Sequence, residues 1–178
     1  STVAYSFLTA AAANVIQAFG TAEQKQRFLP HMFSGRFSGT MALTEPNVGS
    51  SLGDLTTKAI PQADDQYLIK GQKMFISGGD QDITENIVHL VLARIQDAPQ
   101  GVKGISLFIV PKFRTHLDGT LAEANDVQLA GLLHKMGYRG TTNCLLNFGE
   151  GKYKPQGKAG AIGFLVGTLH RGLANMFH

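Results

Sequence analysis

The feature that most limits the possible folds is a change of hydrophobic period near residue 37. From Phe37 to Thr44, larger and smaller residues alternate, as they do along a β-strand. Short segments of similar character follow, separated by Gly, Pro, Asn and Asp, and this pattern predicts an antiparallel barrel or sandwich. The further predicted strands cover residues 55–60, 67–69, 73–77, 87–95, 105–110 and 143–148.

The segments outside this region have a helical character. Residues 3–19 contain a run of alanines and are followed by Gly20, a favoured helix stop. Thr21 and Gln24 have capping-box spacing, which predicts a second helix ending near residue 33. Residues 112–127 have weak periodicity and are expected to form a long loop or an excursion between strands. Residues 165–178 carry Leu169, Leu173 and Phe177 at four-residue spacing, which predicts the start of an amphipathic helix.

Composition restricts the function classes. Hydrophobic residues make up 43% of the 178 residues, enough for a core, and the net charge is only +3 without a long basic run. Nucleic-acid binding is therefore not expected, and the polar residues within 3–19 argue against a membrane span. One cysteine, Cys144, excludes an intramolecular disulfide and a cysteine-based zinc site, and is consistent with a reducing cytoplasm. The chain begins at Ser1 without a signal-peptide pattern and is expected to belong to a longer protein.

Several reactive residues have ordinary structural explanations. The six histidines lack paired metal-site spacing, so no metal site is expected. Cys144 lies in a predicted strand and is interpreted as a buried apolar residue rather than a nucleophile. Residues 87–95 are expected to form a core strand, with His89 and Arg94 at exposed positions or at its ends.

Two short segments can carry binding chemistry. In residues 44–51, Pro46 fixes a turn, and Gly49 followed by Ser50 and Ser51 offers an open backbone and two hydroxyls to a phosphate or to the polar edge of a ring. In residues 73–79, Phe75 can cover a flat ring and Ser77 can hydrogen-bond its edge. For either segment alone, an ordinary strand connection is the commoner explanation.

Together and in this order, the two segments resemble the acyl-CoA dehydrogenase family. The middle domain of that family carries a Thr-Glu-Pro-x-x-Gly-Ser turn and, further along, Gly-x-Lys-x-(Trp/Phe)-Ile-(Thr/Ser). Residues 44–50 and 71–77 match these two patterns, except that Ser51 stands where many members have Asp. The resemblance extends over nearly the whole chain through residues 19–25, 29–30, 134–137 and 171–173.

Within the family, the chain is most similar to the branch that includes 3-methylmercaptopropionyl-CoA dehydrogenase. The residues supporting this branch are 75–80, 84–87, 110–113 and 125–127. The resemblance implies an α+β, mainly β fold: residues 1–35 would end an N-terminal helical domain, 36–154 would form an antiparallel β barrel that binds FAD and acyl-CoA, and 155–178 would be a linker and the start of a C-terminal helical domain.

The resemblance also implies roles for single residues. Met41, Leu43 and Thr44 would line the flavin ring, and Gly49 and Ser50 would lie by the pyrophosphate. Ser50 would also approach the acyl-CoA. On the other side of the ring the cover would be Phe75, Ile76 and Ser77, with Ser77 near the hydride-accepting nitrogen.

The implied reaction is α,β-dehydrogenation of an acyl-CoA to a trans-2-enoyl-CoA with reduction of FAD. The family's catalytic glutamate usually lies in the C-terminal domain, so no catalytic residue is assigned here and the isolated chain is expected to be inactive. Glu45 is expected to have a structural role. The implied partners are an electron-transfer flavoprotein or another electron acceptor and, in a homodimer or homotetramer, further copies of the protein. The expected location is the bacterial cytoplasm, or the mitochondrial matrix for a eukaryotic protein.

Other functions of the same family remain open at this point. An acyl-CoA oxidase would use the same motifs, because oxygen access depends on packing that these motifs do not encode. A family member without catalysis could serve as a flavin or acyl-CoA scaffold. One offshoot binds DNA through its C-terminal domain.

Overall fold

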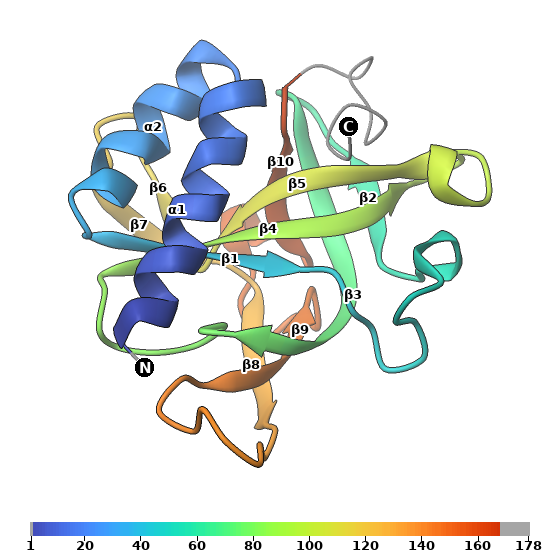
Figure 1. Ribbon diagram of the computed structural model, residues 1–178. Helices are drawn as coiled ribbons and strands as arrows, with labels where there is room; N and C mark the ends of the chain where they lie inside the picture. The colour runs from blue at the N-terminus through green and yellow to red at the C-terminus, as the bar shows by residue number, and fades with distance from the viewer. Residues whose placement is uncertain (1, 168–178) are drawn as a thin grey trace.

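The computed structural model describes residues 2–167 of the chain. Two helices, α1 (Thr2–Phe19) and α2 (Ala22–Phe33), lie together on one side of a curved β structure (Figure 1). Three short 3-10 helices, η1 (Leu52–Asp54), η2 (Val102–Gly104) and η3 (Pro155–Gly157), lie in the connections. The strands are β1 (Phe37–Ala42), β2 (Lys58–Pro61), β3 (Gln66–Ser77), β4 (Asn86–Ile95), β5 (Ile105–Pro111), β6 (Phe113–Thr115), β7 (Leu121–Ala124), β8 (Val127–Leu132), β9 (Asn143–Phe148) and β10 (Ala161–Leu165).

The two helices begin and end where the sequence predicts. The Thr21 hydroxyl accepts from the Gln24 amide at 3.2 Å, and the Thr21 amide donates to the Gln24 side chain at 3.1 Å, which confirms the capping box. The same Gln24 side chain donates to the Leu165 carbonyl at 2.7 Å and so ties the start of α2 to β10. Within residues 2–167, neither helix is long and apolar enough to cross a membrane.

Five strands form a closed barrel in the order β2, β3, β10, β5, β4 and back to β2. One edge of β4 has two partners, because its residues 86–91 pair with β1 and its last two residues pair with β2. Both of these pairings are parallel, so the barrel is not wholly antiparallel as the sequence predicted. The mainly β architecture with flanking helices is confirmed.

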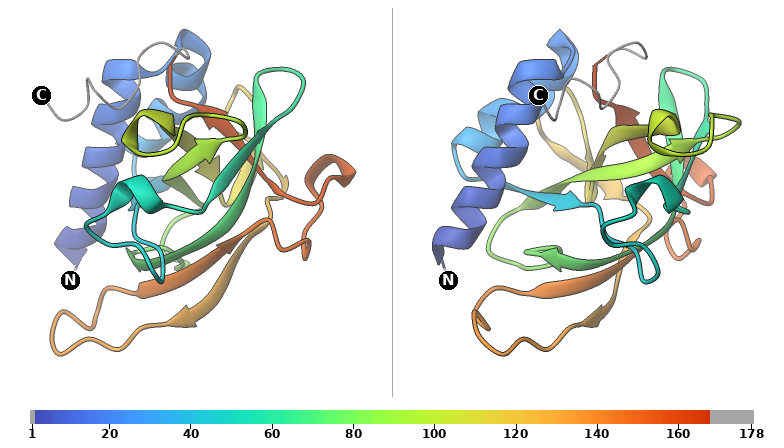
Figure 2. Two further views of the ribbon diagram at one scale, coloured as in Figure 1. Left: turned by 90° about the vertical axis from the view of Figure 1, so that its right-hand side faces the viewer. Right: turned by 45° about the vertical axis from the view of Figure 1, so that its right-hand side comes forward.

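Strand β3 is a single long strand where the sequence predicted two. Its first half, up to Lys70, pairs inside the barrel with β2 and β10. Its second half, from Gly71 to Ser77, pairs with β9, which in turn pairs with β8. Figure 2 shows the β8–β9 pair at the end of the molecule opposite α2. The predicted site residues Phe75, Ile76 and Ser77 therefore lie in the second half of β3, which pairs with β9.

Residues 112–127 form an excursion between strands, the second of the two predicted forms, because they contain the β6–β7 hairpin and lead into β8. Two other predictions about the later part of the chain are wrong. The barrel does not end at residue 154, because β10 pairs with both β3 and β5 and closes the ring. These pairings are long-range and leave little trace in local periodicity. Leu165 ends β10 rather than beginning a helix, and Leu169, Leu173 and Phe177 lie outside the described residues.

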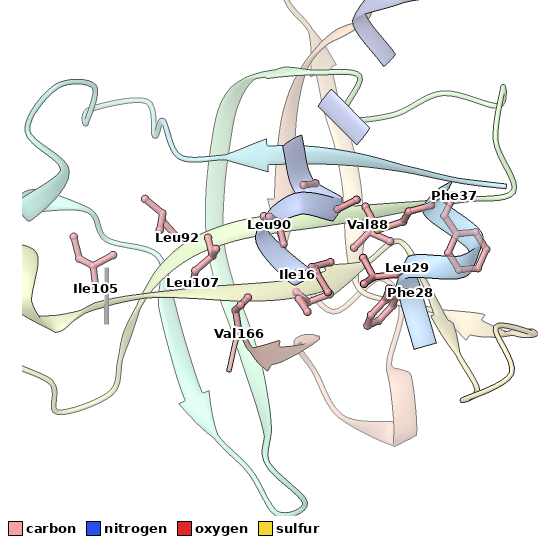
Figure 3. Close-up of a cluster of buried hydrophobic side chains, with 14 of the residues drawn as sticks. Ile16, Phe28, Leu29, Phe37, Val88, Leu90, Leu92, Ile105, Leu107 and Val166 are labelled. Carbon is pink, nitrogen blue, oxygen red and sulfur yellow. The ribbon is translucent and has the colours of Figure 1, made fainter. Parts of the chain in front are cut away.

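Two hydrophobic clusters hold the layers together. The first packs α1 and α2 against the outer faces of β1, β4 and β5 and includes Ile16, Phe28 and Leu90 (Figure 3). The second fills the barrel and the inner face of the β3–β9–β8 sheet, with Phe108 and Phe148 among its members. β1 and β4 therefore each lie between the two clusters. For this reason β4 is buried on both faces along nearly its whole length.

One prediction about β4 fails. His89 was expected at an exposed position or at an end of the strand, but it lies within β4 and is fully buried. Its Nδ1 atom lies 2.7 Å from the Thr40 hydroxyl, and its ring stacks edge-on against Phe148. Burial lowers the pKa of His89 to about 3, so the ring is neutral near pH 7.

Candidate functional site

The two segments singled out by the sequence meet just beyond the end of β1. The Met74 amide donates to the Thr44 carbonyl at 2.9 Å. The Lys73 ammonium donates to the Leu43 carbonyl, also at 2.9 Å. Two consecutive residues of β3 therefore hold two consecutive residues of the turn that follows β1.

A buried ion pair completes this junction. Lys73 is 0% exposed and its Nζ atom lies 2.9 Å from Oε1 of Glu45, whose side chain is 3% exposed. The Glu45 carboxylate also accepts from Thr56, from the amide at 2.7 Å and the hydroxyl at 2.7 Å. Thr57 donates to it in the same way, at 3.0 Å and 2.6 Å. The carboxylate thus joins the turn, the approach to β2 and the middle of β3.

The charges of this pair are fixed by its surroundings. Burial alone would raise the pKa of Glu45, but hydrogen bonds from Thr57 and Thr56 and the nearby charge of Lys73 lower it to about 2. Burial lowers the pKa of Lys73, and Glu45 opposes that effect. Glu45 is therefore an ionised structural residue, as predicted, and it lacks both the exposure and the pKa that a catalytic base requires.

The turn after Thr44 is tight and its tip is exposed. Glu45 and Val48 exchange backbone hydrogen bonds of 2.9 and 3.1 Å, and the buried Val48 side chain anchors the turn in the first cluster. Gly49 and Ser50 then lie exposed. A Cβ atom at Gly49 would meet no heavy atom within 4 Å, so the space beside this backbone is open. Ser51, the departure from the family pattern, donates its hydroxyl to Asp54.

Phe75 stands out of the sheet at a β-bulge. The register between β3 and β9 shifts between Lys73 and Ile76, and Phe75 has a left-handed φ of 60°. Its side chain is 56% exposed, an unusual position for a strained aromatic residue. Ile76 is 2% exposed and packs in the second cluster, so its backbone rather than its side chain would face a ligand.

Two hydroxyl groups remain available at this junction. The side chains of Ser77 and Thr44 are half-buried, and within residues 2–167 neither hydroxyl has a hydrogen-bond partner in the protein. Met41 and Leu43 are also half-buried, and both pack against the first cluster on the side of α1. The junction therefore presents an exposed aromatic face together with free hydroxyls, a combination suited to a flat ring with polar edges.

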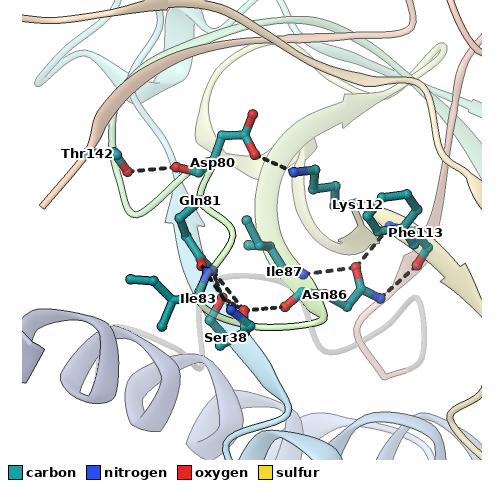
Figure 4. Close-up of polar contacts among 10 residues, drawn as sticks. Ser38, Asp80, Gln81, Ile83, Asn86, Ile87, Lys112, Phe113 and Thr142 are labelled. Atoms are coloured by element: carbon teal, nitrogen blue, oxygen red, sulfur yellow. Dashed lines mark hydrogen bonds and ion pairs between the residues drawn. The ribbon is translucent and has the colours of Figure 1, made fainter.

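The loop that follows Ser77 is fixed by polar contacts (Figure 4). The Gly78 amide donates to the Thr142 carbonyl at 2.8 Å, and the Thr142 hydroxyl donates to the Asp80 carbonyl at 2.9 Å. Lys112 pairs with the Asp80 carboxylate. A Cβ atom at Gly78 would lie 3.1 Å from the Tyr5 ring, so α1 packs closely against the end of β3. The end of β3 is therefore rigidly placed against both β9 and α1.

Other candidate groups do not form a site. Cys144 is buried in the second cluster, and burial raises the pKa of its thiol, in agreement with an unreactive core residue. Within the described residues, no group of three His, Cys, Asp or Glu side chains is arranged to hold a metal ion.

The structure brings some predicted site residues together and leaves others apart. Thr44 contacts the segment that carries Phe75 and Ser77, whereas Gly49 and Ser50 lie beyond Val48 at the exposed tip of the turn. Sequence reasoning gave no role to Lys73, Thr56 or Thr57. A lysine inside a strand motif was the available signal for the first, because a buried ammonium needs an acidic partner. Nothing in the sequence marked the two threonines.

Comparison with known proteins assigns nearly the whole chain to one family. Residues 40–150 match the family model "Acyl-CoA dehydrogenase, middle domain", and residues 1–36 match the N-terminal domain model of the same family. A butyryl-CoA dehydrogenase of Syntrophomonas wolfei is 44% identical over 99% of the chain and 29% of that relative. The 3-methylmercaptopropionyl-CoA dehydrogenase of Ruegeria pomeroyi is 41% identical over 96% of the chain and 27% of that relative.

Solved structures have the same fold. Caenorhabditis elegans ACDH-11 in complex with C11-CoA superposes with a TM-score of 0.73 at 24% identity, over 97% of the chain and 28% of that protein. An acyl-CoA dehydrogenase from Geobacillus kaustophilus gives a TM-score of 0.66 at 26% identity, over 92% of the chain and 37% of that protein. The chain spans less than a third of the length of the Syntrophomonas wolfei and Ruegeria pomeroyi relatives.

Proposed function

Because the chain belongs to the acyl-CoA dehydrogenase family, we propose that it forms the flavin wall of an FAD-dependent acyl-CoA dehydrogenase. We define the flavin wall as Met41, Leu43, Thr44, Gly49, Ser50, Phe75, Ile76 and Ser77. The observation that supports this best is that, among residues 2–167, the hydroxyls of Thr44 and Ser77 have no hydrogen-bond partner, at a junction that also carries the exposed Phe75. All of these residues lie within residues 40–150, the part of the chain that matches the family's middle-domain model.

The wall's residues have separate tasks in this proposal. Phe75 covers one face of the flavin ring, and Ser77 donates a hydrogen bond to the ring edge where charge develops. Thr44 hydrogen-bonds the other polar edge, and the exposed backbone at Gly49 and Ser50 donates to the pyrophosphate. Ser50 also contacts the acyl-CoA. Bound FAD would supply the hydride acceptor for α,β-dehydrogenation of an acyl-CoA thioester.

The base that removes the α-proton is proposed to lie elsewhere in the protein. Glu45 is unsuitable because it is buried and its pKa is lowered to about 2. An electron-transfer flavoprotein or a related acceptor would then reoxidise the flavin, in a homodimeric or homotetrameric enzyme. We place this enzyme in the bacterial cytoplasm, a proposal supported by the bacterial relatives.

The test is Ser77→Ala in the full-length FAD-loaded enzyme. Loss of one hydrogen bond to the developing charge should slow flavin reduction about tenfold to hundredfold and change substrate affinity much less. Anaerobic stopped-flow absorbance measures the two quantities separately. Ser106→Ala, a half-buried serine on β5 outside the flavin wall, is the matched control. Equal reduction rates in the wild type and Ser77→Ala would contradict the assigned role.

A further inference from the structure

We propose that Lys73 and Glu45 are positioning residues, which set the distance between the two halves of the flavin wall without touching the flavin. One half is the end of β1 and its turn, and the other is the bulge at Phe75 with Ser77. This inference rests on the proposed function and assigns a specific task to a buried ion pair.

Lys73 ties the first half directly. Its ammonium reaches the Leu43 carbonyl and the Glu45 carboxylate, each at 2.9 Å, and it is 0% exposed. The neighbouring Met74 amide adds a hydrogen bond to Thr44. Three successive residues of the turn are therefore held from two successive residues of β3, so movement of β3 must move the carbonyl and hydroxyl of Thr44 with it.

The second half follows immediately after Lys73. Phe75 occupies a left-handed conformation that a bulky side chain rarely adopts, so surrounding contacts must hold it there. On one side of the bulge, Lys73 is fixed by the ion pair. On the other side, Ile76 is fixed in the second cluster and the Gly78 amide is bonded to Thr142. The ion pair is thus one of two anchors of the bulge.

Glu45 extends the junction to a third segment. Its four hydrogen bonds from Thr56 and Thr57 hold the chain just before β2. Thr57 in turn packs against the backbone of Gly71, where an added Cβ atom would lie 2.5 Å from the Thr57 hydroxyl. Glu45, Thr57 and β3 therefore form a closed set of contacts around Lys73, and a shift of one requires a shift of the others.

A charged pair provides directional contacts that an apolar pair does not. Replacing both members of a buried ion pair by well-packed apolar residues is often neutral for stability, so stability alone does not require a charged pair at this position. Methionine has a similar length and volume but cannot donate to Leu43 or Glu45. In Lys73→Met, the carboxylate of Glu45 keeps its four threonine donors, so the fold should persist while the tie between turn and bulge is lost.

The experiment compares Lys73→Met with wild type in the full-length FAD-loaded protein. We expect the dissociation constant for FAD to rise about tenfold or more, because small displacements of positioned groups have large effects. The visible spectrum and the reduction potential of the bound flavin should shift as well. Thr57→Val is an isosteric substitution that removes one hydroxyl donor from Glu45. It should change the FAD affinity, the spectrum and the potential in the same direction as Lys73→Met, but by less. It keeps the proposal testable if Lys73→Met fails to fold.

The matched control is Asn125→Ala. Asn125 is also a buried polar anchor, bonded to Pro111 and Ile162, but it contacts neither the turn nor the bulge. It should lower the urea midpoint without changing FAD affinity, spectrum or potential. Unchanged flavin properties in both Lys73→Met and Thr57→Val would overturn the positioning role and leave the flavin wall intact as a proposal. A wild-type protein that does not bind FAD would overturn both proposals.

Discussion

Two buried carboxylates, Glu45 and Asp126, both need hydrogen-bond donors inside the protein, and they receive them from different groups. Asp126 is 0% exposed and accepts from the amides of Gly151 and Tyr153, at 2.6 and 3.2 Å, so it fastens the loop after β9. Glu45 accepts from two threonines and from the ammonium of Lys73. Backbone amides brace one loop, whereas a cation from another strand joins distant segments. Only the second arrangement joins the turn after β1 to β3, the two segments proposed to form the flavin wall.

The largest expected effect is the loss of stability when either carboxylate is removed. Glu45→Ala leaves Lys73 buried without an acidic partner and should lower the free energy of unfolding by about 3–5 kcal/mol. Asp126→Ala leaves only backbone amides near a partly exposed loop and should cost about 1–3 kcal/mol. Urea denaturation of the two variants beside wild type measures both values. Equal losses would mean that the ion pair adds nothing beyond ordinary hydrogen bonds.

The second prediction uses pH to separate the charge of Glu45 from its shape. The pKa of Glu45 is about 2 when folded, below its ordinary value of 4.5, so its stabilisation is present above pH 4.5 and is lost as the pH falls toward 2. The loss should reach about 3 kcal/mol. Urea denaturation at several pH values measures it.

Glu45→Gln provides the reference for this pH experiment. His89 has a pKa lowered to about 3 when folded, so it also destabilises the protein as the pH falls below 6.5. That contribution is present in both wild type and Glu45→Gln, and the difference between the two curves isolates Glu45. Parallel curves below pH 4.5 would contradict the lowered pKa.

The smallest expected effect concerns the bulge that the ion pair anchors. Glycine adopts the left-handed conformation of Phe75 without strain, whereas alanine is strained in it. Phe75→Gly should therefore unfold with a free energy about 1 kcal/mol higher than that of Phe75→Ala, the reverse of their order in an ordinary strand. Chemical denaturation of the two variants tests this. The ordinary order would show that the backbone at residue 75 is not held in a strained state.

Local patterns predicted much of the fold because the residues involved interact with near neighbours. Thr21 and Gln24 form the predicted capping box, and the strand at Asn143–Phe148 has the predicted bounds. The predictions failed where distant segments decide the outcome. His89 has a polar side chain, yet a partner on β1 and a ring from β9 make its burial possible.

The candidate site divides along the same line. The motif residues Thr44, Phe75 and Ser77 were recognisable from the sequence, because a family resemblance marks residue types at fixed positions. The free state of the two hydroxyls and the left-handed backbone of Phe75 were not, because both depend on what surrounds each residue. The roles of Thr56 and Thr57 were equally hidden, since threonines before a strand have no distinctive pattern.

The sequence by itself determined the family, the alternation that makes strands, the capped start of α2 and the residue types at the proposed flavin wall. Only the tertiary structure decided that Glu45 and Lys73 form a buried pair, that the barrel closes through β10, and that one edge of β4 serves both β1 and β2. The physical reason is that helix caps and strand alternation are local. Burying an ammonium requires a carboxylate that folding brings from another segment, and closing a barrel requires edges that are distant in the chain.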